Sequence, residues 1–85
     1  MIEITKYSTP NCMNCKILGM RLKPIIEAHK DNCTFTEVDI TTQGNPLNIS
    51  SVPWIVIKRE GEELYNDHVS NVVEMISKIK TLLGE

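Results

Sequence analysis

The sequence predicts one α/β domain, spanning residues 1–85, with the element order β-α-β-α-β-β-α. Three observations lead to this fold class. Apolar and polar residues alternate near the N-terminus, as in a half-buried strand. The segments that follow switch between helical spacing and runs of β-branched residues. The chain is long enough for one modest core, and no repeat, linker or low-complexity tract divides it.

The N-terminal third predicts a strand followed by a helix. Residues 2–7 alternate isoleucine with polar residues, which is typical of a short strand. From residue 12 to about residue 30 apolar side chains recur at helical spacing, and Asn11 is the expected N-cap. Pro24 lies inside this pattern, and because it removes a helical hydrogen bond it should kink the helix or end it near Lys23.

The middle of the chain predicts two more strands separated by a loop. Residues 33–40 are rich in β-branched side chains and indicate a second strand. Residues 41–51 contain glycine, proline and polar residues, which suit a loop with one or two helical turns. The continuous apolar run at residues 54–57 is typical of a central strand buried on both faces.

The C-terminal third predicts a hairpin and a closing helix. Glu60-Gly61 supplies a turn, after which residues 62–66 pair back as an antiparallel strand. Seven apolar residues between Val69 and Leu83 form one stripe at helical spacing, with Ser70 as the expected cap.

Composition excludes two classes of partner. With 9 basic against 11 acidic side chains, the net charge is −2, and no basic patch or aromatic platform for nucleic acid is visible. The longest apolar run has about four residues, too short to span a membrane. The N-terminus lacks the pattern of a secretory signal, and three cysteines do not form a fully paired framework. We therefore expect a cytoplasmic protein.

Cys12 and Cys15 are the residues most indicative of chemistry. They stand three apart at the expected start of the first helix, where unpaired N–H groups and the helix dipole favour a thiolate. Lys16 and Lys6 add positive charge nearby. We expect Cys12 to be the attacking nucleophile and the better shielded Cys15 to resolve the mixed disulfide. No cofactor is expected besides the reversible Cys12–Cys15 disulfide.

A metal site is the main alternative for this pair, and two buried thiols without a role are a third possibility. Structural zinc commonly needs two pairs of cysteine or histidine ligands at short spacing. The other candidates here are Cys33, His29 and His68, which form no second pair. Redox chemistry is therefore the preferred interpretation.

Val52-Pro53, before the apolar strand, forms the second informative segment. Proline cannot donate to a sheet ladder, so it belongs at the start of a strand. A cis Val52–Pro53 bond would leave the Val52 backbone free to pair with an extended substrate, whereas an ordinary trans proline is the alternative. Trp54 either packs in the core or shields the thiols.

Two segments resemble the thioredoxin and glutaredoxin family. Residues 7–16, YSTPNCMNCK, are similar to its active-site segment, and residues 49–58, ISSVPWIVIK, are similar to its cis-proline loop before the final hairpin. The resemblance covers essentially the whole chain. It implies a minimal thioredoxin fold, a four-stranded mixed sheet with helices on both faces. It also implies Cys12 as nucleophile, Cys15 as resolving thiol and Pro53 as the cis-proline beside them.

The expected substrate-binding residues surround these thiols: Pro10, Met13, Val52 and Trp54. Met13-Asn14, between the cysteines, is most similar to the small glutaredoxin-like electron donors of ribonucleotide reductase and to short thioredoxins. Lys6 stands where typical thioredoxins carry a buried aspartate. The help with proton transfer that this aspartate gives is therefore missing or replaced. Residues 65–69, YNDHV, lack the glycine pair with which glutaredoxins hold glutathione, and Asp67 is only a weak candidate for it.

The resemblance implies a monomeric thiol-disulfide oxidoreductase that reduces protein disulfides. A thioredoxin-reductase-like flavoenzyme is the expected electron source, and ribonucleotide reductase is one possible substrate. A glutathione-dependent glutaredoxin is the second interpretation. A non-enzymatic binding module or metal carrier built on the same two thiols is the third.

Overall fold

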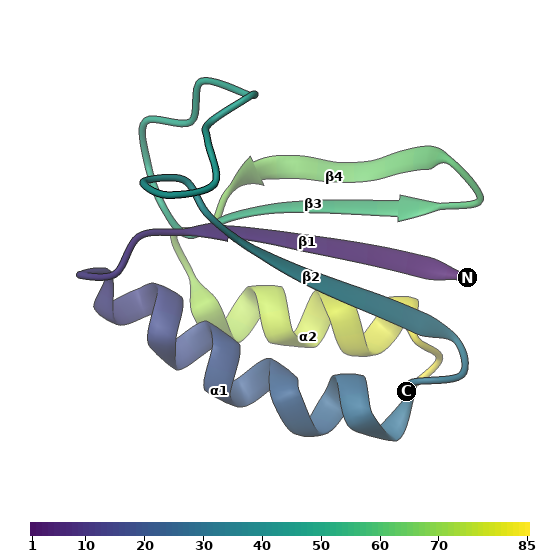
Figure 1. The fold of residues 1–85 in the computed structure, drawn as a ribbon. Helices are drawn as coiled ribbons and strands as arrows, with labels where there is room; N and C mark the ends of the chain where they lie inside the picture. Colours follow the sequence, from purple (N-terminus) through teal and green to yellow (C-terminus); the bar gives the residue numbers. More distant parts are fainter.

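The computed structural model describes residues 1–85 and contains four strands and two helices (Figure 1). The helices pack against the sheet as a second layer. In chain order the elements are β1 Ile2–Ser8, α1 Met13–Ala28, β2 Cys33–Asp39, β3 Trp54–Arg59, β4 Glu62–His68 and α2 Val72–Leu82.

The four strands form one mixed sheet in the order β2-β1-β3-β4. β1 runs parallel to β2 and antiparallel to β3, and β3 pairs antiparallel with β4. Because a parallel pair needs a crossover, α1 carries the chain from the end of β1 to the start of β2. In the ladder Lys6 lies opposite Glu37 of β2, and Tyr7 lies opposite Trp54 of β3. The predicted α/β class and the four-stranded mixed sheet are confirmed.

The core fills the space between the sheet and the two helices. On β1 the even-numbered residues are buried toward the helices and the odd-numbered ones point to the other face, as the sequence alternation predicts. The buried cluster draws on every element except β4, together with Val69 before α2: Ile2, Ile4, Leu18, Leu22, Ile25, Cys33, Ile55, Ile57, Val69, Met75 and Ile79.

Residues 40–53 form a loop with turns, and the one or two helical turns expected in this region are absent. Gly44 has a φ of 93°. The Asn45 side chain closes the segment by two hydrogen bonds to the backbone of Ile49, both of 2.8 Å. These side-chain bonds give the backbone an alternative to helical pairing, which is why no helix forms.

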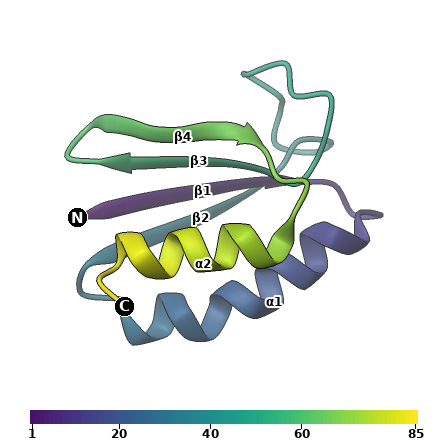
Figure 2. The same ribbon diagram turned by 180° about the vertical axis from the view of Figure 1, so that it is seen from behind.

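Both helices therefore lie on the same face of the sheet, as the two opposite views in Figures 1 and 2 show. The expectation of helices on both faces is wrong. The other face is rich in polar residues, including Glu3, Thr5, Thr34 and Thr36. Polar side chains tolerate water, so this face needs no second helical layer.

α1 begins one residue later than predicted and passes through Pro24. Its N-cap is Cys12, and Asn11 instead belongs to the preceding turn. Pro24 is exposed, so the carbonyl that lacks its proline partner can be hydrated, and the helix continues to Ala28 instead of ending near Lys23.

α2 is capped by Asn71 and not by the predicted Ser70. The Asn71 side chain accepts a hydrogen bond of 3.0 Å from the backbone N–H of Glu74. Replacing Asn71 with alanine should lower the free energy of unfolding by about 1 kcal/mol, because a first-turn N–H loses its acceptor. Urea unfolding measures this change, with Ser70→Ala as the matched control. An equal loss in Ser70→Ala would contradict the assignment of the cap.

Candidate active site

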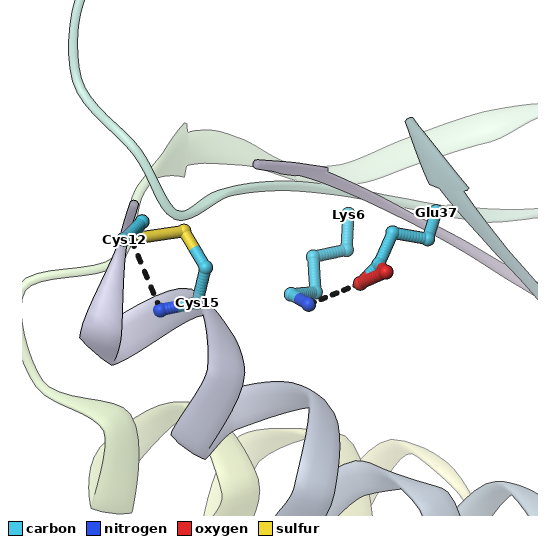
Figure 3. The surroundings of a disulfide bond; sticks show 4 residues. All are labelled: Lys6, Cys12, Cys15 and Glu37. Carbon is cyan, nitrogen blue, oxygen red and sulfur yellow. Dashed lines mark hydrogen bonds and ion pairs between the residues drawn. A yellow bond between two sulfur atoms is a disulfide. The ribbon is translucent and has the colours of Figure 1, made fainter. Parts of the chain in front are cut away.

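Cys12 and Cys15 are joined by a disulfide at the start of α1, with their Cα atoms 5.2 Å apart (Figure 3). Cys12 is the N-cap residue, and its sulfur accepts a hydrogen bond of 3.1 Å from the backbone N–H of Cys15. A cysteine in this position meets the positive end of the helix dipole and a free N–H donor. Both features favour the thiolate of Cys12 once the disulfide is reduced.

The two sulfurs differ in their access to solvent. Cys15 is 2% exposed and lies on the core side of the helix. Cys12 is half-buried at the end of the molecule from which α1 starts. A large partner can therefore approach Cys12 but not Cys15, in agreement with the shielding expected for Cys15.

The loop between β1 and α1 holds Cys12 in place. Residues 10–11 form a turn, and the backbone N–H of Cys12 donates to the carbonyl of Thr9 at 3.3 Å. The carbonyl of Cys12 then accepts from the N–H of Lys16 at 3.2 Å. Because β1 lies inside the sheet, the loop starts from a fixed point.

The Val52–Pro53 peptide bond is cis, as the resemblance implies. Trp54, the first residue of β3, pairs with Tyr7 near the end of β1. Pro53 therefore lies at the same end of the sheet as the loop that carries the cysteines. In Figure 3 the segment that leads into β3 passes beside the disulfide. Val52 is half-buried, and its backbone makes no hydrogen bond within the chain.

The other predicted substrate-binding residues have accessible side chains. Pro10 is exposed, and Met13, directly after Cys12, is 68% exposed. Trp54 lies on the sheet face away from the buried cluster, so it does not pack in the core. Its indole N–H donates to the side-chain oxygen of Asn66 at 2.7 Å, which holds the ring over β4.

A cleft of about 730 Å³ lies between α1 and the β1–β2 edge of the sheet. Its lining includes Cys15, Lys6, Glu37 and Asp39. Lys6 is almost fully buried and forms an ion pair with Glu37. Hydrogen bonds from Thr41 hold the pKa of Asp39 below its usual value. The sequence did not single out Glu37 or Asp39. The strand alternation, combined with a parallel pairing of β1 and β2, is the signal that places Glu37 beside Lys6.

The remaining cysteine and histidines lie away from the disulfide. Cys33 is buried at the start of β2, and burial raises the pKa of its thiol. His29, at the end of α1, contacts Glu85 at 2.6 Å. His68 ends β4. The structure contains no group of three or more histidine, cysteine or acidic side chains arranged to hold a metal ion. Neither helix has the length and apolar character needed to cross a membrane.

Comparison with known structures relates this geometry to one family. A germline-specific thioredoxin of Drosophila melanogaster superposes with a TM-score of 0.80 at 14% identity, over 95% of this chain and 80% of the other. Thioredoxin O2 of Arabidopsis thaliana gives 0.79 at 20% identity, over 98% and 76%. A thioredoxin of Trichomonas vaginalis gives 0.73 at 28% identity, over 95% and 78%.

Sequence comparison gives the same assignment. No curated protein is similar enough in sequence to count as a match. The thioredoxin family model, however, matches residues 2–81, which include both cysteines and the cis-proline. The match and the Cys12–Cys15 disulfide identify a thioredoxin-like redox protein and, in general terms, a disulfide oxidoreductase. The chain thus belongs to the thioredoxin family.

Proposed function

We propose that this protein reduces disulfides in other proteins through the Cys12/Cys15 dithiol and is recycled by a thioredoxin-reductase-like flavoenzyme. The observation that carries the proposal is the asymmetry of the pair. Cys12 is the half-buried N-cap of α1, whereas Cys15 is 2% exposed behind it.

The asymmetry assigns one step to each sulfur. The Cys12 thiolate attacks a substrate disulfide, which forms a mixed disulfide and releases one substrate sulfur as a thiolate. Cys15 then loses its proton and attacks the Cys12 sulfur. This closes the Cys12–Cys15 bond and releases the second substrate sulfur, which takes up a proton. Two electrons pass from the dithiol to the substrate.

The surface around Cys12 suits an extended protein segment. Met13 and Pro10 offer exposed apolar contacts on one side of the thiol. On the other side the unpaired backbone groups of Val52 can hydrogen-bond to a substrate strand, as in β-augmentation. The half-buried Trp54 ring adds apolar area next to them.

The end of β4 lacks the features expected of a glutathione site, which favours a flavoenzyme as the electron source. The segment from Tyr65 to Val69 contains no glycine pair. Asp67, the weak candidate for glutathione, already accepts a hydrogen bond of 2.7 Å from the backbone N–H of His68. The Tyr65 hydroxyl donates to the His68 carbonyl at 3.1 Å. Both side chains thus already have hydrogen-bond partners within the chain.

Insulin reduction with two electron sources tests the proposal. Turnover driven by NADPH and thioredoxin reductase should exceed turnover driven by glutathione and glutathione reductase by roughly tenfold or more, a difference of about 1.4 kcal/mol in transition-state free energy. Equal or faster turnover with glutathione would instead support a glutaredoxin. Stoichiometric zinc retained through a mild chelator, without turnover in either system, would support a binding module.

The proposed setting follows from the direction of electron flow. A dithiol that acts as a reductant must be kept reduced, and the cytoplasm, where thiols are kept reduced, is the setting we propose. There a monomer would supply electrons to protein disulfides, and ribonucleotide reductase is one candidate substrate.

A further inference from the structure

We propose that Lys6 is a positioning residue for the second step of the reaction, in which its buried ammonium stabilises the thiolate of Cys15. This inference rests on the proposed function, because it concerns the closure of the Cys12–Cys15 bond. Glu37 is the counter-ion that holds the ammonium in place.

The packing of Lys6 against α1 is the first argument. Its side chain is 3% exposed and extends from β1 toward the helix layer. Gly19 lies one helical turn after Cys15 on the same side of α1. A Cβ atom at position 19 would lie only 2.9 Å from the Lys6 Nζ, so the ammonium is in contact with the helix at this glycine. Figure 3 shows the Lys6 side chain extending from β1 toward α1, on the same side of the sheet as Cys15, with its ammonium directed at Glu37.

The location of Glu37 is the second argument. It lies directly opposite Lys6 in the β1–β2 ladder, and its side chain is 51% exposed. The ion pair therefore joins a buried cation to a carboxylate in contact with water. Because that water screens and competes for the carboxylate, Glu37 only partly neutralises the field of Lys6 toward Cys15.

Filling the core does not by itself require a lysine at this position. Removing an ammonium from water is costly, and an apolar side chain of similar volume commonly serves a core as well as a buried ion pair does. The surrounding buried cluster is made of such side chains, among them Leu18, Leu22 and Ile4. A cation retained beside this cluster, in the same cleft as a sulfur that must become an anion, has a chemical use.

The other charged groups of the cleft are more strongly screened. From α1 the cleft is lined by Lys16, Lys23 and Glu27, and all three are exposed. From β2 it is lined by Glu37 and by the half-buried Asp39. Lys6 is the buried charge among them, and water screens a buried charge less than it screens an exposed one.

The charge acts at a defined point of the reaction. In the mixed disulfide, Cys15 is a thiol and must give up its proton before its sulfur can attack that of Cys12. The proton passes to water in the cleft, and the departing substrate thiolate gains one in turn. The positive charge of Lys6 lowers the free energy of the transient Cys15 anion.

Stopped-flow reaction of the reduced protein with dithiobis(nitrobenzoate) separates the two steps. Attack by Cys12 releases the first thionitrobenzoate, and closure by Cys15 releases the second. In Lys6→Met the second release should be roughly tenfold slower near neutral pH, and its pH midpoint should rise by about one unit. The reason is that a nearby opposite charge lowers the pKa of an acid by about one unit or more. The first release should stay within about twofold of wild type. Lys23→Met, which removes an exposed lysine from the same cleft, should change neither step.

Glu37→Gln keeps the lysine and provides a second test that does not depend on Lys6→Met folding. Removal of the counter-charge should lower the pH midpoint of the second release. An unchanged midpoint in Lys6→Met, an equal slowing of both releases, or a midpoint raised in Glu37→Gln overturns the role of Lys6. If wild-type protein shows neither release, the proposed function itself fails.

Discussion

Replacing Cys12 with serine should abolish insulin reduction, lowering kcat/KM by at least about a thousandfold because the hydroxyl cannot attack a disulfide and no second accessible thiol replaces it. The half-buried sulfur of Cys12 is the only one of the pair that a partner protein can reach. The measurement is the NADPH-coupled turnover of the intact protein with thioredoxin reductase.

Two further variants make the result specific. Cys15→Ser should also lose turnover but should still attack once, so a mixed disulfide with the substrate accumulates and is visible by mass spectrometry. Cys33→Ser is the matched control: its thiol is buried, with a raised pKa, so activity should stay close to wild type. Full activity in Cys12→Ser would refute the assignment of the nucleophile, and a trapped adduct in Cys12→Ser would exchange the two roles.

Replacing Leu22 with alanine should lower the free energy of unfolding by about 3 kcal/mol, within the usual range for a large-to-small change in a core. Leu22 is fully buried between α1 and the sheet. A domain of 85 residues has a total stability of roughly 4 to 13 kcal/mol, so the loss is a large part of it.

Urea unfolding measures this change as a lower midpoint with an unchanged slope. Met20→Ala is the matched control on the same helix, since that side chain is 75% exposed and should cost little. A loss below about 1 kcal/mol for Leu22→Ala would show that α1 does not pack on the sheet as described.

Local patterns in the sequence were enough to predict the four strands and both long helices, and the resemblance added the mixed sheet that the strands form. The alternation on β1 has a period of two residues, and the apolar stripe of α2 has helical spacing. Each pattern marks the apolar face of its element, which is the face that becomes buried. The position of Cys12 and Cys15 at a helix start followed from the same patterns. The resemblance then implied the cis geometry of Pro53, which residue patterns alone left open.

Other features depend on contacts that a linear reading does not contain. The Asn45 side chain makes two hydrogen bonds to the backbone of Ile49, and the loop that they close stands where a short helix was expected. Each helix cap lies one residue after the predicted one, because Asn11 belongs to a turn and Ser70 precedes the residue that reaches the first-turn N–H. The polar residues Glu3 and Thr5 on the odd positions of β1 indicate a solvated second face.

The burial of Lys6 was the least predictable feature of the site. A lysine within an alternating strand usually reaches water with its ammonium. Here the even positions of β1 face the helices, and Gly19 leaves the space for the ammonium. Only the pairing of β1 with β2 and the packing of α1 reveal that Glu37 is its partner and that Cys15 lines the same cleft.

The strand order has a consequence for behaviour at high protein concentration. With β2 and β4 at its two edges, the sheet presents unpaired backbone groups that could join a second copy, the usual start of aggregation. Both edges carry acidic residues, Glu62, Glu63 and Asp67 on β4 and Asp39 on β2. Two copies that meet edge to edge therefore bring like charges together, and this repulsion disfavours the pairing of their edge strands.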